Sequence, residues 1–272
     1  MLFCCLDSRR LLQKRANVGL EPIESKVLSR GLPKDPHKAA EIDGTWYHWQ
    51  DGRLLPEGIL SEANAFSPHR FYRYPSGRPR LPEVGDERAE QLRQWFRRTS
   101  ENPPVRHMGF FDALYRIPSR AQAEEQTVPF DFLGFDVRVH RDLLAPLRRV
   151  ERSIEYRSQE NPKIELFFDS IGQIDGYNWR YIAGTRARSY HSYGAAIDLI
   201  PRRYGRRFPY WRWAADAGIT DWWSIPFTRR WMVPYEIVEA FEQEGFIWGG
   251  KWLYFDTMHF EYRPELQLLS DR

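Results

Sequence analysis

Two short stretches of the chain, far apart in sequence, place histidines and carboxylates where they could hold a metal ion. The first contains His191 and, seven residues later, Asp198, which lies inside the apolar run 195–200. Burying an ionised carboxylate is costly unless it is paired with a cation or bound to a metal. The second stretch, residues 256–261, contributes His259. Two neutral imidazole nitrogens and one carboxylate oxygen suit zinc with a fourth position open for water, as in catalytic rather than structural zinc sites.

Each stretch taken alone has an ordinary structural explanation. A single histidine beside a strand is more often a hydrogen-bonded core residue, and an aspartate at a strand end more often caps a turn. Together, Ser-x-His-x-x-Gly-x-Ala-x-Asp at residues 189–198 and Asp-x-x-His-Phe-Glu at residues 256–261 resemble the M15 family of zinc peptidases. That family contains D-alanyl-D-alanine carboxypeptidases and dipeptidases and L-alanyl-D-glutamate endopeptidases, which act on bacterial cell-wall peptides. The resemblance covers roughly residues 128–272.

The resemblance implies a set of metal ligands and a catalytic carboxylate. The zinc ligands of the family fall on His191, Asp198 and His259, and its catalytic carboxylate falls on Asp256. A carboxylate there can take a proton from water on the metal and then hand it to the departing amine. The alternative for Asp256 is a surface turn residue, which the neighbouring histidine motif disfavours. We therefore expect a hydrolase that uses Zn2+ as its cofactor.

Further residues are expected to contact the substrate. Arg180 closes a Tyr-Asn-x-Arg stretch that resembles one in the family, which implies that its guanidinium stabilises the developing oxyanion. Arg186 and Arg188 compete for that role, although both could be plain surface residues. We expect Ser189 to orient the substrate or the metal loop, and Arg188 and Trp252 to bind substrate. Core packing is the alternative explanation for Trp252.

The motif around the second histidine separates two branches of the family. In the carboxypeptidases it is usually Glu-x-x-His followed by Trp or Phe-Arg, whereas here Asp256-x-x-His259 is followed by Phe-Glu. The Gly-Phe-x-Trp-Gly-Gly-x-Trp run at residues 245–252 resembles the L-alanyl-D-glutamate endopeptidase branch. We therefore favour cleavage of the L-Ala-D-Glu bond of peptidoglycan stem peptides, with a D-Ala-D-Ala carboxypeptidase as the alternative. An alternative of another class is a non-catalytic, zinc-binding module that binds the cell wall.

The hydrophobic pattern predicts a mixture of helices and strands around these motifs. An Asp-Gly pair flanked by aromatic and leucine residues predicts a hairpin around residues 45–55. Helices are expected over 87–98, over 143–154 and between Pro234 and Gly245, and strands over 130–139, 164–168, 195–200 and 258–262. The lack of a regular βαβ alternation indicates an α+β fold. The resemblance implies a Hedgehog/DD-peptidase-like fold, with a central antiparallel sheet, flanking helices and an N-terminal extension.

The chain is expected to have an irregular lead-in over residues 1–40, an accessory N-terminal segment over 41–127 and an M15-like zinc peptidase domain over 128–272. Within the last part, residues 202–231 are rich in Trp and Arg. Such residues could line a groove for glycan rings and peptide carboxylates. We favour the alternative, a packed lobe with a solvated rim.

The composition indicates a water-soluble protein with little charge bias. Hydrophobic residues make up 42% of the chain, the mean hydropathy is −0.64, and no apolar run is long enough for stable membrane insertion. Arginine accounts for 34 of the 40 basic residues, but the net charge is only +3. We therefore expect no nucleic-acid partner, and name the peptidoglycan stem peptide as the partner.

Cysteine is confined to the adjacent pair Cys4 and Cys5. Adjacent cysteines rarely bridge each other, so we predict neither a disulfide framework nor a cysteine zinc site. The Leu-x-x-Cys pattern from Leu2 to Cys5 could be the stub of a lipoprotein signal, although no complete signal is visible. Because the expected substrate is the cell wall, we expect a periplasmic or cell-envelope-associated protein.

Overall fold

The computed structural model describes residues 39–69, 74–101, 105–182 and 185–270, so the expected lead-in and its cysteines lie almost wholly outside the described residues. The N-terminal elements are β1 (Ala39–Ile42), β2 (Thr45–Gln50), β3 (Arg53–Pro56), η1 (Glu57–Ala65), α3 (Asp86–Glu101), α4 (Gly109–Tyr115) and α5 (Arg120–Gln126). The middle elements are β4 (Thr127–Phe132), β5 (Phe135–His140), η2 (Arg141–Leu143), α6 (Leu144–Glu160), α7 (Pro162–Ser170), β6 (Ile171–Asp175), η3 (Tyr190–Tyr193) and β7 (Ala196–Pro201). The C-terminal elements are α8 (Trp211–Asp216), η4 (Trp222–Ser224), η5 (Phe227–Arg229), α9 (Tyr235–Gln243), β8 (Phe246–Trp248), η6 (Gly249–Lys251), β9 (His259–Tyr262) and α10 (Pro264–Ser270).

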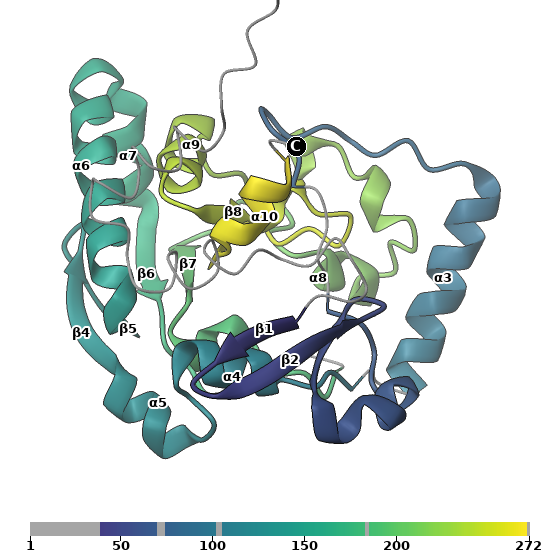
Figure 1. Cartoon of the computed structure of the whole chain (residues 1–272). Coiled ribbons are helices and arrows are strands. Elements are labelled where there is room, and N and C mark those ends of the chain that lie inside the picture. The colour runs from purple at the N-terminus through teal and green to yellow at the C-terminus, as the bar shows by residue number, and fades with distance from the viewer. Residues whose placement is uncertain (1–38, 70–73, 102–104, 183–184, 271–272) are drawn as a thin grey trace, which may run out of the picture.

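The central sheet has the strand order β6-β7-β9-β8, and each neighbouring pair is antiparallel. Figure 1 shows β4, α6 and α7 to the left of this sheet and α8 and α3 to its right. The register between β7 and β9 places Asp198 directly opposite His259. The mixture of helices with antiparallel strands confirms the predicted α+β class, and the sheet pairing alone brings two of the predicted ligands together.

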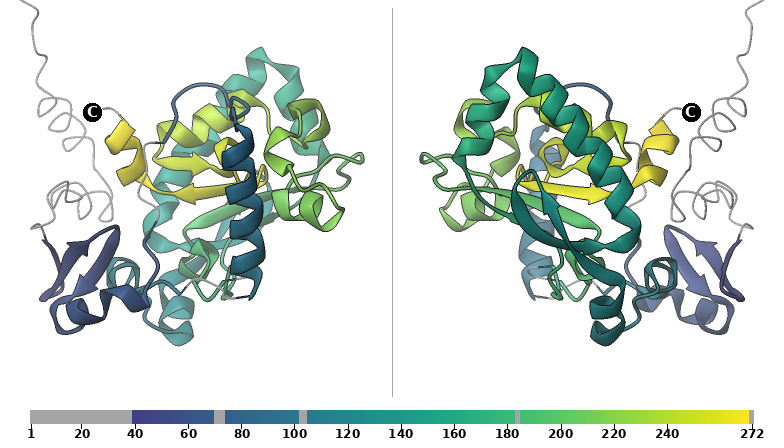
Figure 2. Two further views of the ribbon diagram at one scale, coloured as in Figure 1. Left: turned by 90° about the vertical axis from the view of Figure 1, so that its right-hand side faces the viewer. Right: turned by 90° about the vertical axis from the view of Figure 1, so that its left-hand side faces the viewer.

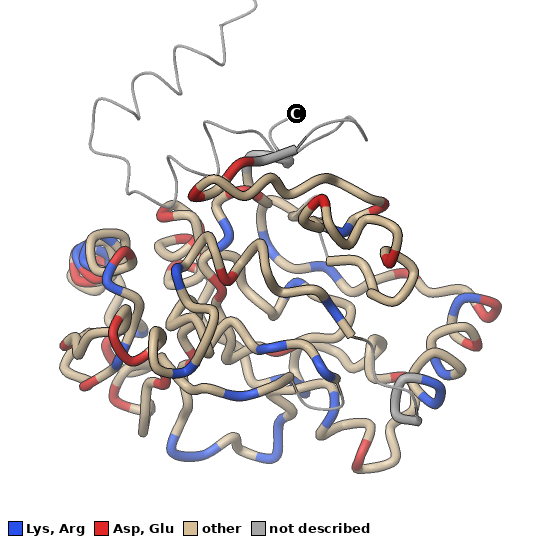
Figure 3. The backbone as a smooth tube through the Cα atoms, turned by 60° about the horizontal axis from the view of Figure 1, so that its bottom comes forward, with Lys and Arg blue, Asp and Glu red and all other residues tan. Residues whose placement is uncertain are grey.

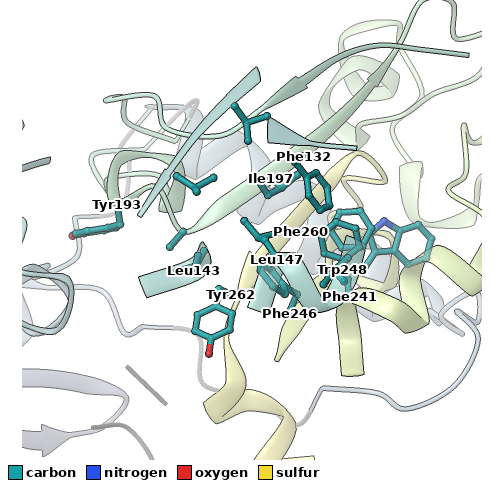
Figure 4. Packing of buried hydrophobic residues seen from close by; sticks show 14 of the residues in the cluster. Phe132, Leu143, Leu147, Tyr193, Ile197, Phe241, Phe246, Trp248, Phe260 and Tyr262 are labelled. Atoms are coloured by element: carbon teal, nitrogen blue, oxygen red, sulfur yellow. The ribbon is translucent and has the colours of Figure 1, made fainter. Parts of the chain in front are cut away.

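The main core lies where α6 and α9 pack against the central sheet. Leu147, Val150 and Ile154 project from one face of α6, and each is at most 2% exposed. Helix α9 contributes Phe241, whose ring stacks on that of Phe260 in β9 with centroids 4.1 Å apart. Figure 4 shows these aromatic rings packed together with the aliphatic side chains of α6. Because β9 is held by this packing, the position of the ligand that it carries is fixed by the core.

The same core continues across the boundary expected at residue 127. Helix α4 contributes Phe110 and Phe111 to it, and the ring of Tyr115 stacks on Tyr193 with centroids 5.1 Å apart. In the described residues, the segment expected to be accessory is therefore packed into the core of the segment expected to be the peptidase domain.

Residues 202–231 form a second, smaller core together with helix α3, and we call this region the aromatic lobe. The buried residues of this core are Ala89, Leu92, Trp211, Ala214, Trp222, Trp223 and Ile225, together with Phe255 from the segment just before Asp256. Trp213, by contrast, is 46% exposed. Figure 2 shows α3 crossing the face of the molecule beside this segment. The tryptophans of residues 202–231 thus mostly fill a packed interior, as in the packed-lobe alternative.

Ion pairs connect elements at the surface of the protein. Figure 3 shows basic positions gathered in the lower middle of the view, with acidic positions mostly at its left and top. Arg93 of α3 contacts Glu90 on the same helix at 3.0 Å and Asp221 of the aromatic lobe at 2.7 Å. Such partly exposed pairs add little stability, so the face of α3 that meets the lobe is set by its buried residues Ala89 and Leu92. None of the described helices is both long enough and apolar enough to cross a membrane.

The strand predicted over residues 164–168 is wrong, because these residues lie in helix α7. The side chain of Asn161 caps the helix by accepting a hydrogen bond from the backbone N–H of Lys163 at 3.2 Å, and Pro162 occupies the first turn. Ile164, Phe167 and Phe168 then recur at helical spacing and meet the main core. A run of apolar residues this short does not by itself distinguish a strand from a helix.

Left-handed turn residues shape the hairpins. Asp51 and Gly52 have φ angles of 44° and 84°, which two-residue hairpin turns require, and the hairpin predicted there is confirmed. The strand-like stretch over 130–139 is also a hairpin, because Leu133 and Gly134 take φ angles of 54° and 82° and reverse the chain. The other predicted helices and strands correspond to α3, α6, α9, β7 and β9, and three of them begin one residue before the observed element.

Candidate metal centre

The structure brings His191, Asp198 and His259 together at one point. His259 Nδ1 lies 2.7 Å from Asp198 Oδ1, His191 Nε2 lies 3.1 Å from Asp198 Oδ2, and the two imidazole nitrogens lie 3.2 Å apart. Asp198 and His259 are opposed across the β7–β9 pair, whereas His191 comes from η3. Among the described residues, these three form a group that could hold a metal ion.

Short local contacts fix the loop that carries His191. Ser189 caps η3, and its Oγ accepts a hydrogen bond from the backbone N–H of His191 at 3.4 Å. Gly194 ends η3 with a φ of +61° and its carbonyl accepts a hydrogen bond from His140 at 2.9 Å. A side chain at Gly194 would meet the backbone nitrogen of His140 at 2.6 Å, so only glycine fits there. The motif glycine is therefore required by the packing of the metal loop.

The hydrogen bonds on the far side of each ring indicate which nitrogen faces the centre. His191 Nδ1 lies 2.5 Å from the carbonyl oxygen of Gly176, which can only accept, so Nδ1 carries the proton and Nε2 offers its lone pair. His259 Nε2 lies 3.1 Å from Oε1 of Glu261 and carries the proton in the same way, so Nδ1 offers its lone pair. Each imidazole thus presents one lone pair to the same point, where Asp198 presents a carboxylate.

This donor set fits a bound cation. Two lone pairs and a carboxylate that face one another at 2.7–3.2 Å repel unless a positive charge lies between them. Zinc held tetrahedrally at about 2.0–2.1 Å separates its ligand atoms by about 3.3 Å, close to the spacings seen here. Partners on the outer ring nitrogens are the usual companions of metal-binding histidines.

The electrostatics of the cluster favour positive charge at its centre. Burial acts to raise the pKa of Asp198, but the charges of His191 and His259 and their hydrogen bonds outweigh it and hold this pKa below its usual range. Burial acts to lower the pKa of His259, but the charge and hydrogen bond of Asp198 outweigh it and raise this pKa well above its usual value. A proton and a metal ion would therefore compete for the same position.

Asp256 lies beside this cluster in a setting suited to proton transfer. Burial, followed by the nearby charge of Asp198, raises the pKa of Asp256 to about 7. Its Oδ1 accepts a hydrogen bond from the backbone N–H of Met258 at 3.3 Å, and its own N–H donates to the carbonyl of Gly249 at 3.0 Å. A Cβ at Gly249 would approach the carbonyl oxygen of Asp256 to 2.4 Å. The glycine run before His259 is thus needed for the chain to pass this close to Asp256.

Arg180 is tied to the metal loop through its backbone while its side chain remains exposed. Its N–H donates to Ser192 Oγ at 3.0 Å, and its carbonyl accepts from the N–H of Ser189 at 3.0 Å. Its charge acts on Asp256, where it opposes the effect of burial on the pKa. The predicted oxyanion-stabilising cation therefore lies near the predicted catalytic carboxylate.

The remaining predicted site residues lie in different surroundings. The guanidinium of Arg188 is bonded to Asp112 and lies over the ring of Trp179 at 4.8 Å, so its binding groups are already engaged within the protein. Arg186 is exposed. The ring of Trp252 lies 5.7 Å from that of His259, and within the described residues its Nε1 has no hydrogen-bond partner. Trp252 can therefore shape the approach to the metal, whereas Arg188 chiefly holds α4 against the metal loop.

Sequence reasoning did not anticipate two tyrosines from the aromatic lobe that border the site. Tyr204 donates its hydroxyl to Met258 Sδ at 3.1 Å, next to His259. Tyr210 forms an isolated antiparallel bridge with Asp256, and burial followed by the charge of Asp256 raises its pKa to about 12. No local pattern marks these tyrosines, because only the fold brings residues 202–231 to the metal centre.

Residues 183–262 match the M15 peptidase family model that is described as D-alanyl-D-alanine carboxypeptidase. The matched range contains the three converging ligands, Asp256 and the aromatic segment 202–231. The chain gave no match among curated proteins or solved structures. The match supports the resemblance to the M15 peptidase family, and the His-Asp-His cluster is compatible with the metal site that this resemblance implies.

Proposed function

We propose that this protein is a zinc peptidase of the bacterial cell wall that hydrolyses the L-Ala-D-Glu bond of peptidoglycan stem peptides. The observation that carries the proposal is the convergence of His191, Asp198 and His259 beside Asp256. Metal ligands alone would suit a structural or binding site. A neighbouring, partly buried carboxylate adds the proton carrier that hydrolysis requires.

His191, Asp198 and His259 would hold the metal. When bound, zinc supplies a Lewis acid at this centre and lowers the pKa of water. Asp256 accepts the proton of the attacking water and later donates it to the departing amine. Arg180 offers an exposed guanidinium near Asp256 that can stabilise negative charge developing on the scissile carbonyl oxygen.

The preference for the endopeptidase reaction rests on the Gly-Phe-x-Trp-Gly-Gly-x-Trp run at residues 245–252. Within this run Trp248 is buried and donates its Nε1 hydrogen to the carbonyl of Thr257 at 2.9 Å, and Gly249 contacts Asp256. The run thus contacts the proposed catalytic carboxylate. This contact supports using the run to choose between the two branches of the family. A D-Ala-D-Ala carboxypeptidase is the second candidate, because the matching family model carries that description.

The proposed substrate sets the proposed location. Stem peptides lie in the cell envelope, so we propose that the protein acts in the periplasm or associated with the envelope. A non-catalytic module that binds the cell wall remains the alternative of another class, and the presence of Asp256 beside the ligand cluster argues against it.

The test is mass spectrometry of muropeptides after incubation with the zinc-loaded protein, with Asp256→Asn as the matched control. We expect scission between L-Ala and D-Glu by the wild type and none by the variant. Loss of the terminal D-Ala alone would replace the endopeptidase proposal with the carboxypeptidase candidate. Intact muropeptides that nevertheless bind the wild type would support the non-catalytic alternative.

A further inference from the structure

Glu261 is the residue of the second motif that the proposed reaction does not use. It lies two positions after His259 on β9, so both side chains project from the same face of the strand. Its Oε1 lies 3.1 Å from His259 Nε2, the ring nitrogen that points away from the metal position. The side chain of Glu261 is 13% exposed. A largely buried carboxylate thus stands directly behind one metal ligand.

Two further charged residues, Arg263 and Glu265, lie on the side of Glu261 that faces away from His259. Arg263 Nη1 lies 3.6 Å from Glu261 Oε2, and Arg263 Nε donates to Glu265 in the first turn of α10. The side chain of Arg263 is 6% exposed, and its guanidinium also lies 4.9 Å from the ring centroid of Tyr190. The arrangement is a buried row of alternating charge that runs from the metal ligand His259 to the C-terminal helix.

The two histidine ligands are held by different means. His191 directs Nε2 to the centre because its Nδ1 donates to the carbonyl of Gly176. His259 directs Nδ1 to the centre, and its Nε2 donates to Glu261. A carboxylate acceptor fixes the tautomer and the orientation of an imidazole and makes its other nitrogen a stronger ligand than a neutral carbonyl does.

We propose that Glu261 is a positioning residue that makes His259 bind the metal through Nδ1 and tightens that bond, while Arg263 and Glu265 hold its carboxylate in place. This inference rests on the metal site of the proposed function. The competing explanation is that Glu261 merely neutralises Arg263. The distances disfavour it, because Arg263 is already in closer contact with Glu265 and the nearest partner of Glu261 is His259.

The variants Glu261→Gln and Glu261→Ala separate the two explanations. Glutamine keeps an oxygen that can accept from His259 Nε2 but loses the negative charge, whereas alanine removes both. The zinc affinity of each metal-free protein is measured by competition with a chromophoric chelator, in the absence of substrate. We expect alanine to weaken zinc binding by about 10- to 100-fold, as is typical when the partner of a metal-binding histidine is lost, and glutamine to weaken it less.

Glu242→Gln is the matched control. Glu242 is also a largely buried carboxylate, with a side chain 15% exposed and an ion pair to Lys251 at 2.6 Å, but none of its described contacts reaches a metal ligand. We expect this variant to bind zinc as the wild type does. Equal weakening by Glu242→Gln and Glu261→Gln would overturn the proposal, because it would show a general effect of losing a buried charge.

A spectroscopic measurement keeps the proposal testable if the alanine variant does not fold. In protein labelled with 15N at histidine, we expect His259 to carry its proton on Nε2 in the zinc-loaded wild type and in Glu261→Gln. Cobalt substitution should shift the visible spectrum in Glu261→Gln and leave it unchanged in Glu242→Gln. A wild-type zinc affinity and cobalt spectrum in Glu261→Gln would overturn the inference.

These outcomes are independent of peptide cleavage. A wild type that binds zinc but cleaves no muropeptide would contradict the proposed function and leave the role of Glu261 standing. Failure of the wild type to bind zinc would overturn both.

Discussion

The central sheet and the aromatic lobe contribute to the site in different ways. The sheet region provides all three proposed metal ligands and fixes them by strand register, by the capped loop η3 and by hydrogen bonds behind each histidine ring. The aromatic lobe provides no ligand. It holds the segment that contains Asp256, through a bridge from Tyr210 and a hydrogen bond from the N–H of Thr257 to the carbonyl of Pro209 at 2.8 Å.

This difference implies that the proposed metal binding and the proposed catalysis depend on partly separate parts of the molecule. The sheet region holds the three residues that would bind zinc, and Asp256, the proposed proton carrier, is held both by Gly249 and by the lobe. Damage to the sheet region should therefore remove both metal and activity, whereas damage to the lobe should reduce activity and leave the metal bound. The following predictions test that separation, from the largest expected effect to the smallest.

Removing a ligand from the sheet should have the largest effect. We expect His259→Ala to lose stoichiometric zinc and, since a metal supplies several kcal/mol of transition-state stabilisation, to lower the rate of hydrolysis by roughly 1,000-fold or more. Metal content by atomic absorption and muropeptide assays are the measurements. Full zinc occupancy in this variant would contradict the ligand assignment.

Removing the proton carrier should lower the rate without releasing the metal. We expect Asp256→Asn to reduce hydrolysis by about 100- to 10,000-fold, the usual range for general acid–base catalysis. Because Asp256 is not among the three converging ligands, zinc content should match that of the wild type. Joint loss of zinc and activity would break the proposed separation.

A cavity in the aromatic lobe should destabilise the lobe ahead of the metal centre. Trp222 is 1% exposed and its ring lies 4.9 Å from that of Trp211, so we expect Trp222→Ala to lower the free energy of unfolding by about 3–5 kcal/mol. Trp213→Ala is the matched control because Trp213 is 46% exposed, and its effect should be within about 0.5 kcal/mol. Urea unfolding followed by circular dichroism gives both values, and zinc content below the transition should be unchanged.

Acid should weaken the main core in part through His69, because burial lowers its pKa as it lowers the pKa values of His107 and His140. The ring of His69 packs on Phe111 of the main core with centroids 5.0 Å apart, and burial lowers its pKa from 6.5 to about 4. Between pH 6.5 and 4 the unfolded chain therefore binds a proton that the folded protein does not. Stability falls through this range by at most about 3.5 kcal/mol, from about 1.4 kcal/mol for each pKa unit, and levels off below pH 4.

Hydrogen exchange at stepped pH distinguishes the two regions. The aromatic lobe has no histidine in residues 86–101 or 202–231, so its amides should keep their protection longer than those around His69. His69→Gln should reduce the pH dependence of unfolding, while His107 and His140 still contribute to it. An undiminished dependence in that variant would assign the acid sensitivity to other groups.

The sequence predicted the parts of the site that depend on short-range spacing. His191 and Asp198 lie on adjoining segments, and residues 258–262 were predicted as a strand because apolar residues alternate there with polar ones. The structure brings these ligands together as expected. The turns at Asp51 and Gly52 were predictable for a similar reason, because only a few residue types tolerate left-handed backbone angles.

Long-range packing accounts for what the sequence did not predict. The helix over residues 164–168 is an exception, because its start signals, Asn161 and Pro162, are local and compete with a short apolar run that also suits a strand. The role of Arg188 depends on Asp112, which is distant in sequence. Helix α3 packs against residues 202–231, although no sequence pattern in either segment indicates that they are in contact. Such pairings are specified by complementary packing, which a single sequence does not reveal.

The cross-strand pairing of Asp198 with His259 has a consequence for folding. Neighbouring residues of a strand face opposite sides of the sheet, so a slip of β9 by one position would turn the His259 side chain away from Asp198. Only correctly aligned strands would then bind the metal. A metal present at 100 times its dissociation constant would favour the aligned pairing by about 2.7 kcal/mol. Binding of the ion would thus favour the correct register of β7 and β9 during folding as well as in the native state.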